Sequence, residues 1–235
     1  MSRKWSAEDI PDQAGRVAIV TGANSGLGYV TALELARHGA EVVMACLSAE
    51  KGEATAARIE DVASGPKPRV LQLDLGSLDS VGRFADSFSG VRVDLLVNNA
   101  GVMMTPQRTT ADGFELQLGT NHLGHFALTG QLLEALQRSD AGLIVTLSSN
   151  EHKGGWIDFD DLQQERDYSP RGAYQRSKLA NAVFAIELDR RLRAAGSTTI
   201  SVPPWRRRSP AARRLLDALR RARAVARERA SGRAG

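Results

Sequence analysis

The chain has 235 residues but only one cysteine, Cys46, and aromatic residues make up just 5% of it. A single cysteine cannot form an internal disulfide, and Cys46 ends an apolar run, so we expect a buried, unreactive thiol. No segment is apolar over the roughly 20 residues that a membrane-spanning helix needs, and no apolar run follows Arg3 and Lys4 as in a signal peptide. These absences predict a cytoplasmic protein without a transmembrane segment.

The net charge of +4 is unevenly distributed along the chain. Residues 202–235 hold eleven arginines against Asp217 and Glu228, a local charge of +9, so the preceding residues carry −5. The body therefore lacks the basic surface that nucleic-acid binding requires, and we expect no nucleic-acid partner for it. With 42% hydrophobic and 25% charged residues, the composition is that of an ordinary globular protein.

Short apolar runs alternate with longer amphipathic stretches over most of the chain. We expect five buried strands, at residues 17–20, 41–46, 70–73, 94–97 and 142–147. We expect helices near residues 26–38, 50–63, 78–88 and 112–137, and a last one from Tyr174 to Ala194. Strands that alternate with helices of this length favour right-handed βαβ units. The pattern predicts one α/β domain with a doubly wound parallel sheet, and a long functional loop at 148–172.

Three glycines stand where the first strand turns into the first helix, in the segment TGANSGLG at residues 21–28. Gly22 would permit the tight turn, Gly26 would let backbone N–H groups approach a pyrophosphate, and Gly28 would allow close packing of helix on strand. The spacing G-x3-G-x-G differs from the common fingerprint G-x-G-x-x-G, so an ordinary glycine-rich turn is the alternative.

The ends of the next strands face the region where ligands bind in open α/β sheets. Asp74 follows the third strand and could bond an adenine amino group or cap the next helix. The segment NNAG at 98–101 follows the fourth strand and could line a cofactor or form a turn. The second strand ends in Leu47 and Ser48, without the carboxylate that would bond the ribose 2′-hydroxyl of NAD, because Glu41 lies at the opposite edge.

Ser148 and Ser149 end the fifth strand, and Tyr174 and Lys178 lie four residues apart on the last helix. Residues at this spacing share a helix face, so the Lys178 ammonium would favour the Tyr174 phenolate and lower the phenol pKa. A tyrosine of lowered pKa can exchange a proton near neutral pH. Taken alone, an exposed Tyr and Lys pair is the simpler interpretation, but these motifs occur together and in one order.

Together the motifs resemble the short-chain dehydrogenase/reductase family over residues 14–201. The resemblance is carried by TGANSGLG at 21–28, NNAG at 98–101, TNHLGHF at 120–126, LSS at 147–149 and YQRSK at 174–178. TNHLGHF and the SKLAN at 177–181 are most similar to the retinol-dehydrogenase-like branch, which includes protochlorophyllide-reductase-like enzymes. The resemblance implies a Rossmann-type fold and an NAD(P)-dependent oxidoreductase that interconverts a small-molecule alcohol with an aldehyde or ketone by hydride transfer.

The resemblance also implies roles for individual residues. Tyr174 would be the catalytic acid or base, Lys178 would bind the nicotinamide ribose and tune that tyrosine, and Ser149, rather than Ser148, would bond the substrate oxygen. Asn121 would hold a water that links Lys178 to solvent. The residues expected to contact the cofactor are Gly22, Asn24, Ser25, Gly26, Leu27, Gly28, Ser48, Asp74, Leu75, Asn98, Ala100, Gly101, Tyr174 and Lys178.

The second strand departs from the family pattern. The branch usually has an arginine just after this strand to hold a 2′-phosphate, and here the residue is Leu47. Because no acid is present there to repel a phosphate, we favour NADP(H) over NAD(H), with Ser48 and Lys51 as candidate phosphate contacts. His122 and His125 lack a third partner for a metal ion, and we expect no metal.

A larger departure follows the sixth strand expected at 200–202, where the family has a substrate loop, further helices and a seventh strand. Residues 202–235 are instead rich in Arg and Ala without lysine, which is the composition of a GC-rich coding sequence read out of frame. We interpret this tail as frameshifted or truncated, following an N-terminal extension at 1–13 and the domain at 14–201. A basic amphipathic helix is the alternative. Without the lost elements, a homodimer or tetramer would be weakened.

Three functions from different classes are consistent with these features. The first is the oxidoreductase, the second is a catalytically degenerate dinucleotide-binding protein, and the third is a binder of nucleic acid or anionic surfaces through the tail. Turnover with NADPH and a set of aldehydes separates the first two. Salt-dependent DNA binding that is lost on deletion of residues 203–235 would support the third.

Overall fold

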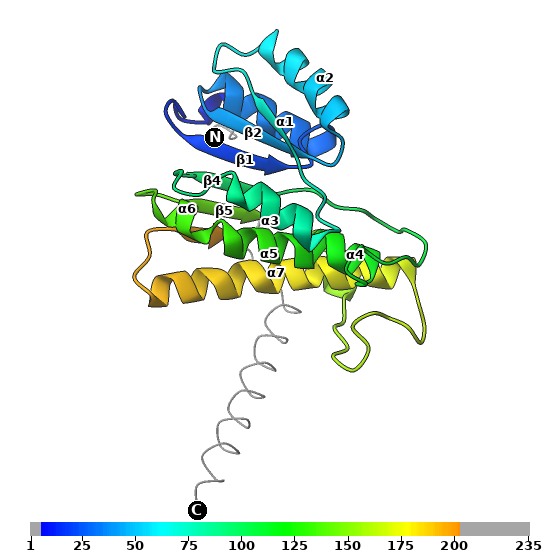
Figure 1. The fold of residues 1–235 in the computed structure, drawn as a ribbon. Helices are drawn as coiled ribbons and strands as arrows, with labels where there is room; N and C mark the ends of the chain where they lie inside the picture. Colours follow the sequence, from blue (N-terminus) through cyan, green and yellow to red (C-terminus); the bar gives the residue numbers. More distant parts are fainter. Residues whose placement is uncertain (1–5, 203–235) are drawn as a thin grey trace, which may run out of the picture.

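In the computed structural model, which describes residues 6–202, the chain folds around one six-stranded sheet. All neighbouring strands are parallel, in the order β3-β2-β1-β4-β5-β6. The strands are β1 (Val17–Thr21), β2 (Glu41–Cys46), β3 (Arg69–Gln72), β4 (Leu95–Asn98), β5 (Leu143–Thr146) and β6 (Ile200–Val202). The strand order reverses between β1 and β4, so their carboxyl ends flank the crevice where doubly wound sheets bind ligands (Figure 1). The predicted fold class is confirmed.

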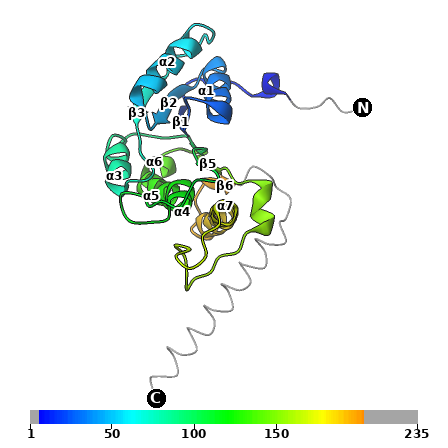
Figure 2. The ribbon, with the colours of Figure 1, turned by 90° about the vertical axis from the view of Figure 1, so that its right-hand side faces the viewer.

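Helices connect the strands and cover both faces of the sheet. The longer ones are α1 (Gly26–Arg37), α2 (Ala49–Glu60), α3 (Leu78–Asp86), α5 (Gly124–Gln131), α6 (Leu133–Gln137) and α7 (Pro170–Ala194). The short ones are η1 (Ala7–Asp9), α4 (Leu116–Leu118), η2 (Gly119–Leu123) and η3 (Asn150–Gly154). Figure 2 shows α1 and α2 apart from α3, α5 and α6, on the other side of the strands.

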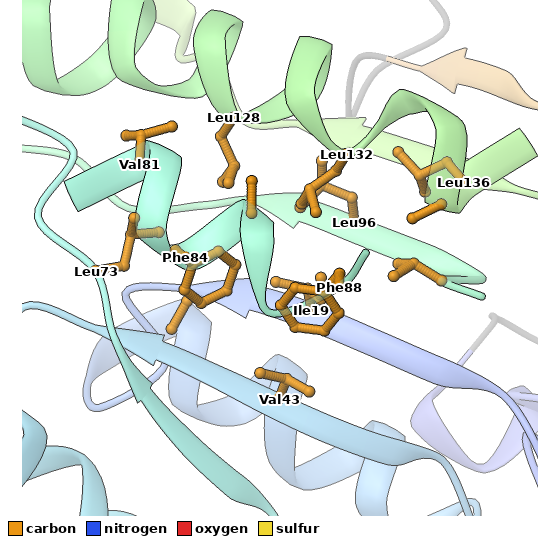
Figure 3. Packing of buried hydrophobic residues seen from close by; sticks show 14 of the residues in the cluster. Ile19, Val43, Leu73, Val81, Phe84, Phe88, Leu96, Leu128, Leu132 and Leu136 are labelled. Atoms are coloured by element: carbon orange, nitrogen blue, oxygen red, sulfur yellow. The ribbon is translucent and has the colours of Figure 1, made fainter. Parts of the chain in front are cut away.

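Alternate residues of β1 contribute to two cores, one on each face of the sheet. Ala18 and Val20 pack with buried side chains of α1 and α2, whereas Ile19 packs with Phe84 of α3 and Leu128 of α5. Figure 3 shows the second of these cores. Because side chains alternate along a strand and both faces are covered, β1 reads in the sequence as a continuous apolar run.

The helix expected at 112–137 is interrupted in the structure. It begins only at Leu116, because Glu115 caps it through side-chain bonds to the N–H groups of Gln117 and Leu118. A π-helical turn, η2, follows, and α5 is separated from α6 at Leu132. A periodic apolar pattern continues through such interruptions, so the sequence did not indicate them.

The last helix begins four residues earlier than expected. Ser169 caps α7 by accepting a hydrogen bond from the N–H of Gly172, and Pro170 occupies the first helical turn, where its missing N–H costs nothing. The loop expected at 148–172 is therefore shorter and contains η3. It passes beside the first turns of α7 (Figure 1).

Two further features bear on the expectations from the sequence. Cys46 is buried, and burial raises the pKa of its thiol. Within residues 6–202, no helix is both long and apolar enough to cross a membrane. The interpretations given for residues 203–235, a frameshifted end or a basic helix, lie outside the described residues.

Candidate active site

The glycine turn between β1 and α1 has the geometry that a phosphate cradle requires. Gly22 and Gly26 have φ angles of 65° and 55°, in the left-handed region that favours glycine. A Cβ at Gly28 would lie 2.3 Å from the carbonyl oxygen of Gly22, so only glycine lets α1 approach the strand this closely. Around Gly26 a Cβ would meet no atom within 4 Å, which leaves that part of the turn open to a ligand.

The N-terminus of α1 is available to an anion. Ser25 is the N-cap residue, yet its side chain makes no capping hydrogen bond, and the first turn contains no acidic residue. The backbone N–H groups of this turn and the positive end of the helix dipole therefore favour a phosphate. Leu27 is largely exposed beside them, and the backbone of Asn24 is tied to α2 through the Thr55 hydroxyl.

At the end of β2, the candidate contacts for a 2′-phosphate surround an exposed Leu47. Ser48 caps α2 by accepting a hydrogen bond from the backbone N–H of Lys51 at 3.2 Å. The Ser48 hydroxyl proton remains available to a ligand. The sequence reasoning overlooked Glu50, which lies in the same first turn of α2 and whose charge opposes a phosphate.

The residues that follow β3 are held by local contacts. The carboxylate of Asp74 accepts a hydrogen bond from the N–H of Gly76 at 2.8 Å, and the cap of α3 is Ser77 rather than Asp74. Leu75 is buried, and its carbonyl lies against Gly124 at the start of α5. Only the backbone of Leu75 and the second oxygen of Asp74 are left for a cofactor.

The two asparagines at the end of β4, Asn98 and Asn99, serve the fold. The Asn98 side chain is buried and donates to the hydroxyls of Thr129 and Thr146, so it points into the core and away from the crevice. Asn99 donates from Nδ2 to the carbonyl of Thr21 at 2.8 Å and thereby joins the glycine turn to β4. For Asn98, a cofactor contact could involve only the backbone.

Thr21 and His125 form a buried bridge that the sequence reasoning missed. The Thr21 hydroxyl oxygen accepts from the N–H groups of Asn99 and Ala100, and it lies 2.8 Å from Nε2 of His125. Nδ1 of His125 lies 3.0 Å from the carbonyl oxygen of Asn121. A carbonyl can only accept, so Nδ1 carries the proton and Nε2 accepts from Thr21. Burial lowers the pKa of His125 to about 4, which keeps the ring neutral.

Asn121 occupies the π-helical turn η2, and its side chain and carbonyl point in different directions. The side chain accepts a hydrogen bond from the N–H of Val102, and its Nδ2 donates to the carbonyl of Val102 and to the Ser177 hydroxyl of α7. The carbonyl accepts from His125 and from Nδ2 of Asn181. A Cβ added to Gly101 would lie 3.0 Å from Oδ1 of Asn121 and 3.5 Å from Nζ of Lys178, so these residues converge.

Tyr174 and Lys178 lie on one face of α7, as the spacing predicts. The Lys178 ammonium nitrogen is 5.7 Å from the centroid of the Tyr174 ring and 3.4 Å from the carbonyl of Leu147. Burial lowers the pKa of Lys178 to about 8, because desolvation penalises the charged form. A lysine with this pKa can release or accept a proton near neutral pH.

The structure distinguishes the two serines at the end of β5. The Ser148 hydroxyl donates to the carbonyl of Lys178 at 2.5 Å, which ties the strand end to α7. The Ser149 hydroxyl accepts from the N–H of Glu151 and donates to no other group among residues 6–202, so in this part of the chain its proton is free for a substrate oxygen. This difference supports the choice of Ser149 as the substrate contact.

The sheet order, the glycine turn at the switch point and the open N-terminus of α1 define a dinucleotide-binding Rossmann fold. A family model described as short chain dehydrogenase matches residues 16–160. The chain is 50% identical over 192 residues to retinol dehydrogenase 11 of Mus musculus and 49% identical over 193 residues to retinol dehydrogenase 13 of Homo sapiens. These matches cover 81% of this chain but 61% and 58% of the relatives, so the chain spans about three-fifths of their length.

Solved structures agree with these relatives. A protein from Mycobacterium paratuberculosis is 48% identical with a TM-score of 0.78, and the match covers 88% of this chain and 75% of that one. A short chain dehydrogenase from Shigella flexneri, solved in complex with NADP, is 25% identical with a TM-score of 0.66 and matches over 82% and 77% of the two chains. The chain belongs to the short-chain dehydrogenase family, in the retinol-dehydrogenase-like branch that its motifs resemble.

Proposed function

We propose that the protein is an NADP(H)-dependent oxidoreductase that interconverts an alcohol with an aldehyde or ketone. The observation that carries this proposal is the buried Lys178 beside the Tyr174 ring, next to Gly101 and Asn121 at the carboxyl end of the sheet. A lysine and a tyrosine in this arrangement can move a proton on a substrate oxygen. The open glycine turn fits a dinucleotide pyrophosphate on the same side of the sheet.

The chain's own residues would divide the chemistry as follows. When bound, the nicotinamide supplies or accepts the hydride. The Tyr174 hydroxyl gives its proton to the carbonyl oxygen during reduction and takes it back during oxidation. The Ser149 hydroxyl donates to the same oxygen and stabilises the negative charge that develops there. The Lys178 ammonium would hold the nicotinamide ribose and stabilise the Tyr174 phenolate, and Asn121 would hold a water that connects Lys178 to solvent.

NADP(H) is the cofactor proposed here because β2 is followed by Leu47 and Ser48 rather than by a carboxylate, and a solved relative was crystallised with NADP. Lys51 and Glu50 lie in the same helical turn and oppose each other at a 2′-phosphate. Lys51→Ala should therefore weaken NADPH binding more than NADH binding. Glu50→Gln should strengthen NADPH binding more than NADH binding. Fluorescence titration of both cofactors measures this, and a parent protein that prefers NADH would contradict the assignment.

We further propose an apolar substrate of the size of retinol or retinal. The relatives named above are retinol dehydrogenases, and exposed apolar side chains lie on the loops after β4 and β5, where Met103 and Trp156 are 60% and 78% exposed. The test compares retinal with acetaldehyde in NADPH-dependent turnover. We expect a higher kcat/KM for retinal. NADPH binding without turnover on any aldehyde would favour the catalytically degenerate alternative.

A further inference from the structure

Arg176 lies between the two catalytic candidates on α7 but faces away from them. It is two residues from Tyr174 and two from Lys178, so its side chain leaves the helix roughly 200° around the axis from either. It is 1% exposed, which is rare for an arginine in any protein. Any effect it has on the reacting groups must pass through the backbone of α7.

Its partner is Glu115, also buried. Nη2 of Arg176 lies 3.2 Å from Oε2 of Glu115, and each side chain is 1% exposed. Nη1 donates to the carbonyl of Asp161 at 3.4 Å. The charged or titratable groups that face Arg176 are Glu115, Asp161 and Tyr168. The pair thus joins α7 to two other segments of the chain.

Glu115 connects this pair to the turn that carries Asn121. Its two carboxylate oxygens accept from the backbone N–H groups of Gln117 and Leu118, at 2.9 and 2.7 Å, and so fix the start of α4. α4 runs without a break into the π-helical turn that contains Asn121. The same carboxylate therefore determines where this helix starts and where it meets α7.

The pair is poorly explained as a source of stability alone. Nε of Arg176 is buried and has no hydrogen-bond partner within residues 6–202. Two buried charges lose their hydration, and a well-packed apolar pair of similar volume often stabilises a protein as well or better. What an ion pair adds is one defined geometry between the two segments that it joins.

We propose that the Glu115–Arg176 ion pair is a positioning device, which sets α7 relative to the π-helical turn and thereby places Tyr174 and Lys178 against Asn121. This inference rests on the proposed function. It assigns no contact with substrate or cofactor to either residue, so both are positioning residues. Further contacts between α7 and the turn complete the same alignment: Asn121 donates to the Ser177 hydroxyl, Asn181 donates to the carbonyl of Asn121, and Oδ1 of Asn181 lies 3.0 Å from Nδ1 of His122.

The test uses the full chain and replaces the pair by apolar residues in the double variant Glu115→Leu/Arg176→Met. Arg176→Lys keeps the charge but loses the planar fork, and Glu115→Gln keeps the shape but loses the charge. Arg193→Met is the matched control, because Arg193 lies on the same helix in an exposed pair with Asp189 at 2.8 Å. Each protein is compared by thermal melting, kcat with its pH profile, and the pKa of Lys178 from competitive chemical labelling followed by mass spectrometry.

We expect the double variant to melt close to the parent but to lose kcat by on the order of 10- to 100-fold, the effect of misplacing reacting groups by about 1 Å. Its Lys178 pKa should rise from about 8 toward the ordinary 10.5, because a loosened turn admits water. In Arg176→Lys, kcat and the Lys178 pKa should lie between those of the parent and those of the double variant. The Arg193→Met control should change neither kcat nor the Lys178 pKa.

A folded double variant that keeps the parent kcat and the parent Lys178 pKa would show that the pair is only structural. If the double variant does not fold, Arg176→Lys and Glu115→Gln are judged by the same two measurements. If the parent itself turns over no substrate, the proposed function fails. The labelling pKa of Lys178 does not depend on turnover, so it still decides whether the pair positions this lysine.

Discussion

Gly28 and Gly130 both lie in helices, but an added methyl group would meet different surroundings at the two positions. At Gly28 it would lie 2.3 Å from the carbonyl oxygen of Gly22 and 2.5 Å from Nδ2 of Asn99, whereas at Gly130 no atom lies within 4 Å. Alanine is favoured over glycine inside a helix by about 0.5–1 kcal/mol. Gly130→Ala should therefore raise the free energy of unfolding by that amount.

Gly28→Ala gains the same helix propensity but must displace the backbone of Gly22. Overpacking of this kind costs about 1–3 kcal/mol, so we expect a net loss of stability of up to roughly 2 kcal/mol. Cofactor binding should suffer separately, because the displaced segment is the glycine turn that we propose to bind the pyrophosphate. One hydrogen bond to a charged group contributes about 1.5–3 kcal/mol, and its loss corresponds to a roughly 10- to 100-fold weaker affinity for NADPH.

Thermal melting and a fluorescence titration with NADPH measure both effects on the two variants and the parent. For a domain of this size, 1 kcal/mol shifts the melting temperature by roughly 2–4 °C, so the two alanines should move it in opposite directions. Gly130→Ala should leave NADPH affinity unchanged. If Gly28→Ala melted like Gly130→Ala and bound NADPH like the parent, the close approach of α1 to the turn would not matter, and the reasoning would be wrong.

Three further outcomes are expected. Tyr174→Phe should abolish turnover and leave NADPH affinity intact, because only the proton-transferring hydroxyl is lost, whereas Lys178→Ala should reduce both; a Tyr174→Phe protein at the parent rate would refute the mechanism. Ser149→Ala should lower kcat, while Ser148→Ala should mainly lower the melting temperature, since its hydroxyl binds the backbone of α7; equal kinetic effects would contradict this division. Below pH 6.5 His125 binds a proton in the unfolded chain but stays neutral in the folded protein. The contribution of the buried His125 to stability is therefore complete above pH 6.5 and is lost as the pH falls toward about 4. Urea unfolding of the parent and of His125→Gln from pH 7 to 4 should show a loss that is larger in the parent by up to roughly 3 kcal/mol. The comparison with the variant is needed because burial also lowers the pKa of His122, which both proteins contain.

The positions of the strands could be predicted from the sequence because burial on both faces leaves a continuous apolar run that few other structures produce. β1, β2 and β4 coincide with such runs to within a residue or two. The glycine turn was equally readable, since Gly22 and Gly26 adopt φ angles that other residues rarely accept. In each case a single local requirement determines the residue type.

Other parts of the site depend on contacts between segments far apart in the sequence. Whether the amide of Asn98 meets a cofactor or the core depends on Thr129 and Thr146, which no local pattern connects to it. The same holds for Arg176, which the sequence presents as an ordinary surface arginine. It is buried because it forms an ion pair with Glu115, which is 61 residues away in the sequence. Spacing along one helix predicted Tyr174 and Lys178, but spacing carries no information about partners on other elements.

Thr21 shows why the cofactor turn and the proposed proton path are parts of one structure. Its hydroxyl donates to His125, whose ring donates to the carbonyl of Asn121, and Asn181 of α7 donates to the same carbonyl. All four residues are at most 1% exposed, so each bond lies in a medium of low dielectric where it is strong and where its loss is costly. Valine has nearly the shape of threonine and is favoured in strands, yet at this position it would leave the N–H group of Ala100 without its acceptor and Nε2 of His125 without its donor. The N–H of Asn99 would keep its bond to the carbonyl of Val97. The strand that leads into the glycine turn thus needs a hydroxyl here, because the same atom bonds the segment after β4 and the His125 ring, which in turn bonds the turn that carries Asn121.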